Sequence, residues 1–289
     1  MYKVHCKIID EYFNDLHNVI MNKELERWGE QCTRRFNSLS AKYNKIYYTQ
    51  SPLTNLSDTI ELMVVGINPA AGENGGTGIT NLNAAEFLNG NPSWNIRFST
   101  DGKIDKDWSK FLGNAHSLLG YCNNMRCDTI DDDTKNVWTN LSPFASHKGS
   151  NDLPQELMTA GIKALLELIF ILRPRKIVLL GTNAFNVLDR CKTNLPAEVE
   201  IEHLPIIDNI RLEIGRICTI PTVQICHPTG QWPISNRFTS IFLYLHSQFE
   251  ITQGGVPICP LQQVRGKMQR EIKSWVSRIA VVEDKLIGR

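Results

Sequence analysis

Two polar residues follow apolar runs at positions where parallel sheets often bind ligands. Asn68 comes shortly after the apolar run at residues 62–65, and His227 comes directly after a second such run at residues 222–226. In an open α/β sheet, ligands bind outside the carboxyl ends of the strands. The spacing therefore predicts that the asparagine and the histidine face one pocket.

These residue types fit hydrolysis of an N-glycosidic bond, a reaction that needs a held water and a stabilised anion more than a strong nucleophile. A neutral imidazole at His227 could donate a hydrogen bond to a departing base anion. Asn68 could hold the water, although an amide has no useful pKa and cannot be a general base. Asn140 ends a third apolar segment, and its amide offers a donor and an acceptor to the edge of a base.

The segments around these residues resemble two motifs of the uracil-DNA glycosylase superfamily. The first motif is a strand-end Gly-x-Asn/Asp-Pro turn, and the second is a strand-end His-Pro-Ser/Thr turn before a loop that enters DNA. The resemblance spans about residues 61–248 and implies a monofunctional glycosylase that flips a pyrimidine out of double-stranded DNA. It implies catalytic roles for Asn68 and His227, base contacts from Gly66, Ile67, Pro69, Ala70 and Asn140, and DNA contacts from Pro228, Thr229, Gly230, Gln231, Trp232 and Arg237.

The superfamily also stacks an aromatic ring on the extruded base, from the region after the first motif. Trp94, Phe98 and Phe87 lie in that interval, and we expect Phe98 to be the stacking residue. In the loop after His227, either Gln231 or Trp232 is expected to wedge the duplex open.

Ala70 indicates the substrate class. Superfamily members with the strictest uracil pockets have a Tyr at this place, which blocks substituents at the pyrimidine C5, whereas this chain has a methyl group. The long polar loop at residues 72–107 could bind something as large as a sugar. This combination resembles the bacterial anti-phage branch, which excises glucosylated 5-hydroxymethylcytosine. Excision of uracil or mismatched thymine stays open as an alternative.

Other classes of function use the same kind of sheet. Each of these residues taken alone has a structural explanation, such as a turn, a strand-end cap or a satisfied histidine. The glycine-rich segment at residues 66–78 lacks the Gly-Lys-Ser/Thr ending of a phosphate loop and the spacing of a dinucleotide fingerprint. A nucleotide-binding module or a catalytically inactive DNA-binding protein of the same fold therefore remains as the second alternative.

Strands alternating with helices predict an α/β fold: a three-layer αβα domain with a mainly parallel four-stranded central sheet. We expect the domain at residues 59–249, preceded by a helical extension at 1–58 and followed by a basic helical extension at 250–289 that packs on it. Strands are expected at 61–67, 136–141, 176–181 and 222–226, a peripheral hairpin at 198–217, and helices at 108–119, 155–172, 183–190 and 237–248.

Composition bounds these expectations. Hydrophobic residues make up 42% of the 289 residues, and 31 basic against 30 acidic residues give a net charge of +1, so a DNA surface must come from local clustering. The N-terminus lacks a long apolar segment, which predicts a cytoplasmic protein without a membrane partner. The eight cysteines form no C-x-x-C pair, so we expect neither a metal nor another cofactor, although Cys122 and Cys127 lie close together. No obligate protein partner is evident.

Overall fold

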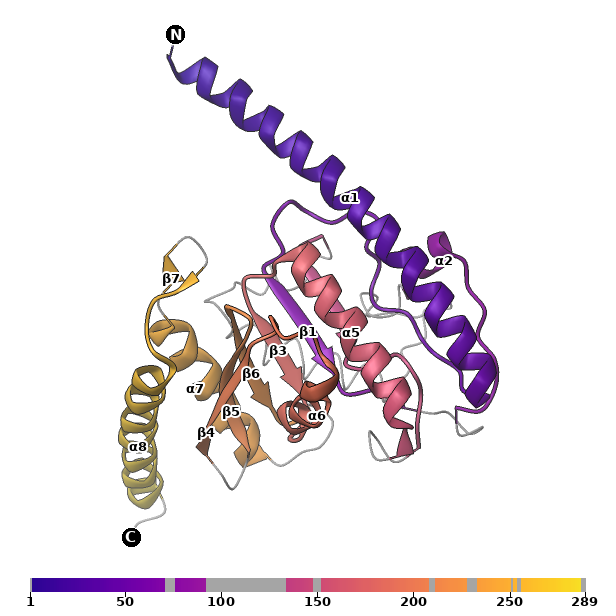
Figure 1. Ribbon diagram of the computed structural model, residues 1–289. Coiled ribbons are helices and arrows are strands. Elements are labelled where there is room, and N and C mark those ends of the chain that lie inside the picture. Colours follow the sequence, from indigo (N-terminus) through magenta and orange to yellow (C-terminus); the bar gives the residue numbers. More distant parts are fainter. Residues whose placement is uncertain are drawn as a thin grey trace. The chain divides into compact units, whose positions relative to one another are not determined.

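The computed structural model describes residues 2–70, 76–91, 134–147, 152–207, 211–227, 233–250, 252–253 and 256–286 (Figure 1). The chain divides into two compact units. The first unit comprises Met1–Ile96, Asp132–Lys176 and Asn186–Pro196, and the second comprises Arg97–Asp131, Ile177–Phe185 and Ala197–Arg289. No helix in the described ranges is long and apolar enough to cross a membrane.

The fold belongs to the α/β class, with helices around a mixed six-stranded sheet of order β2-β1-β3-β6-β5-β4. Its strands are β1 (Leu62–Gly66), β2 (Asn136–Asn140), β3 (Ile177–Leu180), β4 (Ile201–Ile207), β5 (Leu212–Ile217) and β6 (Ile220–Ile225). The pairs β1/β2 and β3/β6 are parallel, whereas β5 is antiparallel to both β4 and β6. All four predicted strands are present. The predicted hairpin also forms, and it joins one edge of the same sheet, which therefore has six strands.

In the first unit, the long helix α1 (Tyr2–Tyr43) packs against α2 (Ala84–Asn89) and α5 (Gln155–Leu172), and Figure 1 shows α1 and α5 side by side. Trp28 Nε1 on α1 donates to Ala164 O on α5 at 2.9 Å. Five aromatic side chains on the inner side of α1, two of them from the helix itself, pack together with neighbouring ring centroids 5.3 to 6.4 Å apart: Trp28, Phe36, Tyr47, Phe87 and Phe144. The expected N-terminal helix is therefore an integral part of this unit.

Helix α5 begins and ends where its sequence predicts. Arg173 adopts a left-handed conformation, with φ of 45°, and its N–H donates to Ile169 O at 2.8 Å, which closes the helix before Pro174. In its middle, Gly161 lets the helix approach the segment after β2. A Cβ at Gly161 would lie 2.6 Å from both Leu141 O and Ser142 Cα, so this contact requires a glycine.

Helix α6 (Ala184–Cys191) leads into a short 3-10 helix, η4 (Lys192–Asn194). Thr182 directly precedes the segment expected to be helical at residues 183–190, and the sequence predicts that its hydroxyl caps this helix. In the structure the amide of Phe185 donates instead to Gln224 Oε1 on β6, at 2.8 Å. The ring of Phe185 also stacks on His203 at 4.5 Å, and His203 Nδ1 lies 2.6 Å from Glu213 Oε2.

The second unit contains α7 (Pro233–Phe249), the small strands β7 (Thr252–Gln253) and β8 (Val256–Pro257), and α8 (Leu261–Leu286). Arg265 Nε and Gln269 Nε2 on α8 donate to Pro205 O and Ile206 O on β4, at 3.0 and 3.3 Å. Apolar side chains at helical spacing are buried on α8, namely Leu261, Val264, Met268 and Ile272. The basic C-terminal helix predicted from the sequence therefore packs on the sheet.

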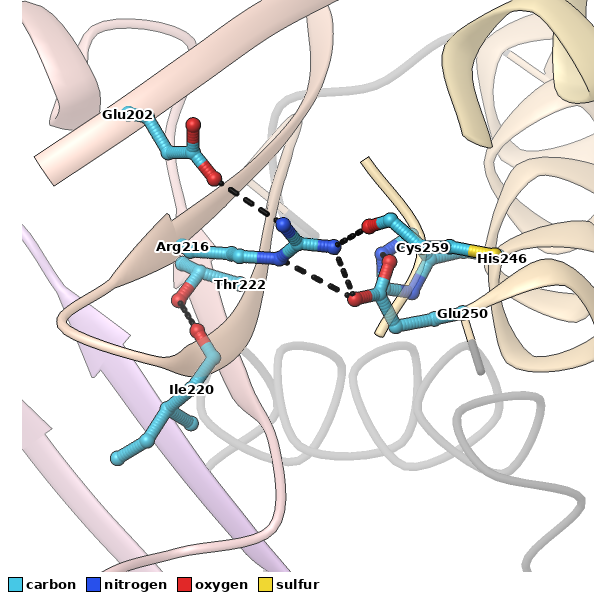
Figure 2. A network of polar contacts seen from close by, with 7 residues as sticks. All are labelled: Glu202, Arg216, Ile220, Thr222, His246, Glu250 and Cys259. Carbon is cyan, nitrogen blue, oxygen red and sulfur yellow. Dashed lines mark hydrogen bonds and ion pairs between the residues drawn. The ribbon is translucent and has the colours of Figure 1, made fainter. Parts of the chain in front are cut away.

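Arg216 joins β5 to the chain segment before α8 (Figure 2). Its Nη2 lies 2.8 Å from Glu250 Oε1 and also donates to Cys259 O, while Nη1 lies 3.2 Å from Glu202 Oε1. Glu250 is buried, whereas Glu202 is largely exposed. The guanidinium of Arg216 thus forms ion pairs with the buried carboxylate of Glu250 and the exposed carboxylate of Glu202.

Candidate functional site

Gly66 and Asn140 lie opposite each other at the carboxyl ends of β1 and β2. The two strand-end loops stay paired beyond that point, because Leu141 N donates to Gly66 O at 2.8 Å and Ser142 N donates to Ile67 O at 3.0 Å. The side chain of Asn140 lies against Gly66, and a Cβ built on Gly66 would overlap Asn140 Oδ1. The glycine of the first motif therefore makes room for a second predicted site residue.

Asn68 is half-buried, and its carboxamide is fixed by two hydrogen bonds. Nδ2 donates to Pro69 O and to Ser146 Oγ, both at 3.0 Å. In the described part of the chain no donor reaches Oδ1 of Asn68. With its amide hydrogens engaged, this residue presents a carbonyl oxygen, which is an acceptor for a water molecule.

Ser146 contacts the candidate site residue Asn68, and the sequence reasoning did not single it out. It is buried, its backbone N–H donates to Pro69 O at 3.2 Å, and it pairs with Ala70 in an isolated parallel bridge. The segment after β2 thus returns alongside the first motif, and Ser146 connects the two. Ala70 itself is exposed.

A small cavity of about 20 Å³ is lined by Asn140 together with Thr139, Pro143, Tyr48 and Gln50, among others. That volume holds about one water molecule. A pyrimidine does not fit in it, so this cavity is not the predicted base pocket.

The predicted aromatic partners differ in their positions. Phe87, the third candidate for stacking on a base, is buried in the aromatic cluster beneath α1, 5.3 Å from Trp28. Its ring is therefore a core element and is not presented to a ligand. Trp94 and the favoured Phe98 lie outside the described residues, as does most of the polar loop at residues 72–107.

His227 follows β6 by two residues, as predicted, and belongs to the second unit. Part of the residue is exposed, yet surrounding protein atoms desolvate the imidazole and lower its pKa from the ordinary value. Desolvation disfavours the charged form, so His227 is held neutral near neutral pH. A neutral imidazole carries one N–H donor and one acceptor nitrogen.

The predicted DNA loop, Pro228, Thr229, Gly230, Gln231 and Trp232, lies outside the described residues. Arg237 lies in the first half of α7, and its side chain is also outside the described part. The roles proposed for these residues stay predictions.

No group of three or more His, Cys, Asp or Glu side chains that could hold a metal ion occurs among the residues that the structure describes. Five described cysteines are in no disulfide bond, namely Cys32, Cys191, Cys218, Cys226 and Cys259. Cys122 and Cys127 lie in the part of the chain that is not described.

Asn140 ends β2 and Asn68 follows the neighbouring β1 by two residues in the first unit, while His227 follows β6 in the second unit. Asn68 offers an acceptor oxygen, Asn140 offers an amide with both a donor and an acceptor, and the histidine offers a neutral donor. In comparisons with known proteins, no family model matches the chain and no curated protein matches it either.

Proposed function

We propose that the protein is a monofunctional DNA glycosylase similar to the uracil-DNA glycosylase superfamily. The observation that carries the proposal is the arrangement of two carboxamides at the ends of neighbouring parallel strands. Gly66 admits the side chain of Asn140, and Ser146 fixes the amide of Asn68 so that its oxygen is the acceptor. Such positioned polar groups at strand ends are what a base-excising site without a strong nucleophile needs.

In the proposed reaction, the bond between the sugar C1′ and the base nitrogen breaks, and its electron pair leaves with the base. Water adds to C1′ and releases a proton to solvent, so the products are the free base and an abasic site. Asn68 Oδ1 accepts a hydrogen bond from this water and positions it. Asn140 binds the Watson–Crick edge of the flipped base, and the neutral His227 donates to the base as negative charge develops.

The proposed substrate is a cytosine with a large C5 substituent, such as glucosylated 5-hydroxymethylcytosine of phage DNA. The exposed Ala70 beside the motif supports this, because a methyl group leaves space that a bulkier side chain would fill. Antiviral defence in the cytoplasm is the setting that such a substrate implies. Uracil or mismatched thymine is the alternative substrate.

The finer fold is part of the same proposal. We infer that β2, β1, β3 and β6 form the parallel four-stranded core of the three-layer domain, and that the β4/β5 hairpin is an addition to its edge. The parallel pairs β1/β2 and β3/β6 support this inference. Under it, residues 59–249 are the catalytic domain.

Base release from synthetic duplexes tests the function. Matched duplexes contain uracil, 5-hydroxymethylcytosine, its glucosylated form, or thymine opposite guanine, and alkali cleavage reports abasic sites. We expect release of the glucosylated base, and a loss of about a hundredfold in Asn68→Ala and in His227→Ala. Asn22→Ala, an exposed change on α1, is the control. If the wild type releases none of these bases, the glycosylase proposal fails.

The substrate class has its own test at Ala70. In Ala70→Tyr the ring should fill the space for a large C5 group, while the contacts from Asn140 and His227 stay in place. Single-turnover release of the glucosylated base should fall far more than release of uracil. A parallel fall on all substrates would show that Ala70 does not gate the C5 position.

A further inference from the structure

A concave surface of the first unit lies between α1 and α5, and its lining includes none of the strand-end residues Gly66, Asn68 and Asn140. It is an open groove with a volume of about 1030 Å³. From α1 its lining includes residues at positions i, i+3, i+4 and i+7 of one helix face, namely Gln31, Arg34, Arg35 and Ser38. From α5 and η4 it includes Gln155, Glu156, Thr159, Lys163 and Asn194.

The groove is cationic. Arg35 is balanced by Glu167 on α5, with Nη2 and Oε1 3.7 Å apart. Arg34 and Lys163 have no ion-pair partner in the described part of the chain. Two positive charges on opposite walls are therefore available to a ligand.

The one carboxylate in the described lining is already engaged. Glu156 Oε2 accepts from Lys42 Nζ at 2.6 Å and from the hydroxyl of Tyr43. These hydrogen bonds lower the pKa of Glu156, with the contribution of Lys42 the largest. Its charge is thus compensated at the end of the groove and does not cancel those of Arg34 and Lys163.

The remaining groove residues identify the chemical class of the ligand. Arg, Lys, Ser, Thr, Asn and Gln are the side chains that contact phosphate oxygens in protein–DNA complexes. The described lining has no aromatic ring on which a base could stack. The α1 face from Gln31 to Ser38 covers about 10 Å, over which one DNA strand carries about three phosphates.

We propose that the groove between α1 and α5 binds the phosphodiester backbone of DNA, as a contact that adds affinity without reading sequence. The choice of DNA as the partner rests on the proposed function, but binding of DNA in this groove does not require that the protein excises bases. With a net charge of +1, the chain needs a local surface of this kind to hold a polyanion.

The test measures binding of a fluorescent duplex without any modified base, by anisotropy over a range of salt concentrations. The variant is Arg34→Gln with Lys163→Gln, and the control is Lys23→Gln with Arg190→Gln. The control removes the same charge from exposed positions of the first unit outside the groove. We expect the groove variant to bind about tenfold more weakly at low salt, with a salt slope smaller by about two, while the control stays near wild type. Thermal unfolding checks that both variants are folded.

Equal binding by the groove variant, the control and the wild type would overturn the inference, and so would a wild type that does not bind the duplex. Stabilisation by a free mononucleotide through Arg34 and Lys163, with duplex binding unaffected, would overturn it as well. Base release is measured separately on the same variants. Groove-dependent binding without base release would contradict only the glycosylase proposal, and base release without groove-dependent binding would contradict only this inference.

Discussion

At the residue scale, the side chain of Asn140 lies so close to Gly66 that a substitution at Gly66 should move it. In Gly66→Ala the new methyl group would overlap Asn140 Oδ1. That oxygen ends a flexible side chain, so we expect Asn140 to rotate away and the free energy of unfolding to fall by only about 1 kcal/mol. Base release should fall about as far as in Asn140→Ala.

A double-mutant cycle supplies the control for this prediction. In the Asn140→Ala background the overlap no longer exists, so adding Gly66→Ala should change base release little. Independent, additive effects of the two changes would show that Gly66 does not act through Asn140.

The imidazole of His227 provides a prediction about pH. Desolvation lowers its pKa, so we expect it to titrate below about 6.5, the ordinary value for histidine. Below that pH the unfolded chain binds more protons at this site than the folded chain does. The stability that the neutral imidazole contributes is therefore present above the unfolded pKa and is lost as the pH falls.

Carbon-13 histidine NMR measures the titration, and the spectrum of His227→Gln assigns the resonance. Since glutamine does not titrate, the melting temperature of this variant should fall less than that of the wild type between about pH 7 and pH 5. A resonance that titrates at or above 6.5 would contradict the desolvation of this site.

At the element scale, Gly161 sets how closely α5 approaches the loop that carries Ser142 and Ser146. In Gly161→Ala the methyl group would meet Leu141 O and Ser142 Cα, both backbone atoms, at 2.6 Å. Backbone cannot rotate away as a side chain can, so we expect a loss of about 3 kcal/mol in the free energy of unfolding.

Gly266 on α8 is the matched helical control. A Cβ there has its nearest neighbour, Arg270 Nη1, at 3.7 Å, so Gly266→Ala should raise stability by about 0.5 kcal/mol through helix propensity. Urea unfolding measures both variants. Equal effects at the two positions would mean that the approach of α5 does not depend on Gly161.

The strands that could be predicted were those with apolar runs and clear turn residues at their ends, such as β1 and β6. The place of the β4/β5 hairpin in the sheet could not be predicted from the sequence, because an alternating apolar pattern does not show which strand of the sheet the hairpin pairs with. In the structure β6 is buried and pairs with β3 on one side and β5 on the other. A buried strand must satisfy its backbone groups on both edges, which is the physical reason that the hairpin extends the sheet.

The candidate site shows a similar limit. Asn68, Asn140 and His227 could be proposed as candidates because each lies at or shortly after the end of an apolar run. Ser146 could not, because its contact with Asn68 arises from the return of a loop, and no periodicity in the sequence encodes that path. The first turn of α6 is likewise capped by Gln224, a residue of the distant strand β6, and not by the neighbouring Thr182 that the sequence predicts.

At the scale of the whole molecule, the terminal helices are built into the units that they accompany. Helix α1 supplies Trp28 and Phe36 to the core of the first unit, and α8 buries an apolar face in the second. Residues 1–58 and 250–289 therefore contribute to stability whatever further role they have. Arg216 tests this for the C-terminal part of the chain, because its partners Glu250 and Cys259 lie in the segment between α7 and α8.

We expect Arg216→Met to lower the free energy of unfolding by about 3 kcal/mol, since it leaves the carboxylate of Glu250 buried without its cation. The side chain of Glu250 is 3% exposed, and His246 Nε2 lies 3.8 Å from its Oε2. Glu202→Gln removes the other ion pair of the same guanidinium, but Glu202 is 54% exposed, so this control should cost less than about 1 kcal/mol. Urea unfolding compares the two variants with the wild type. A small effect of Arg216→Met, no larger than that of Glu202→Gln, would show that the contact between β5 and the segment before α8 does not hold the C-terminal helix in place.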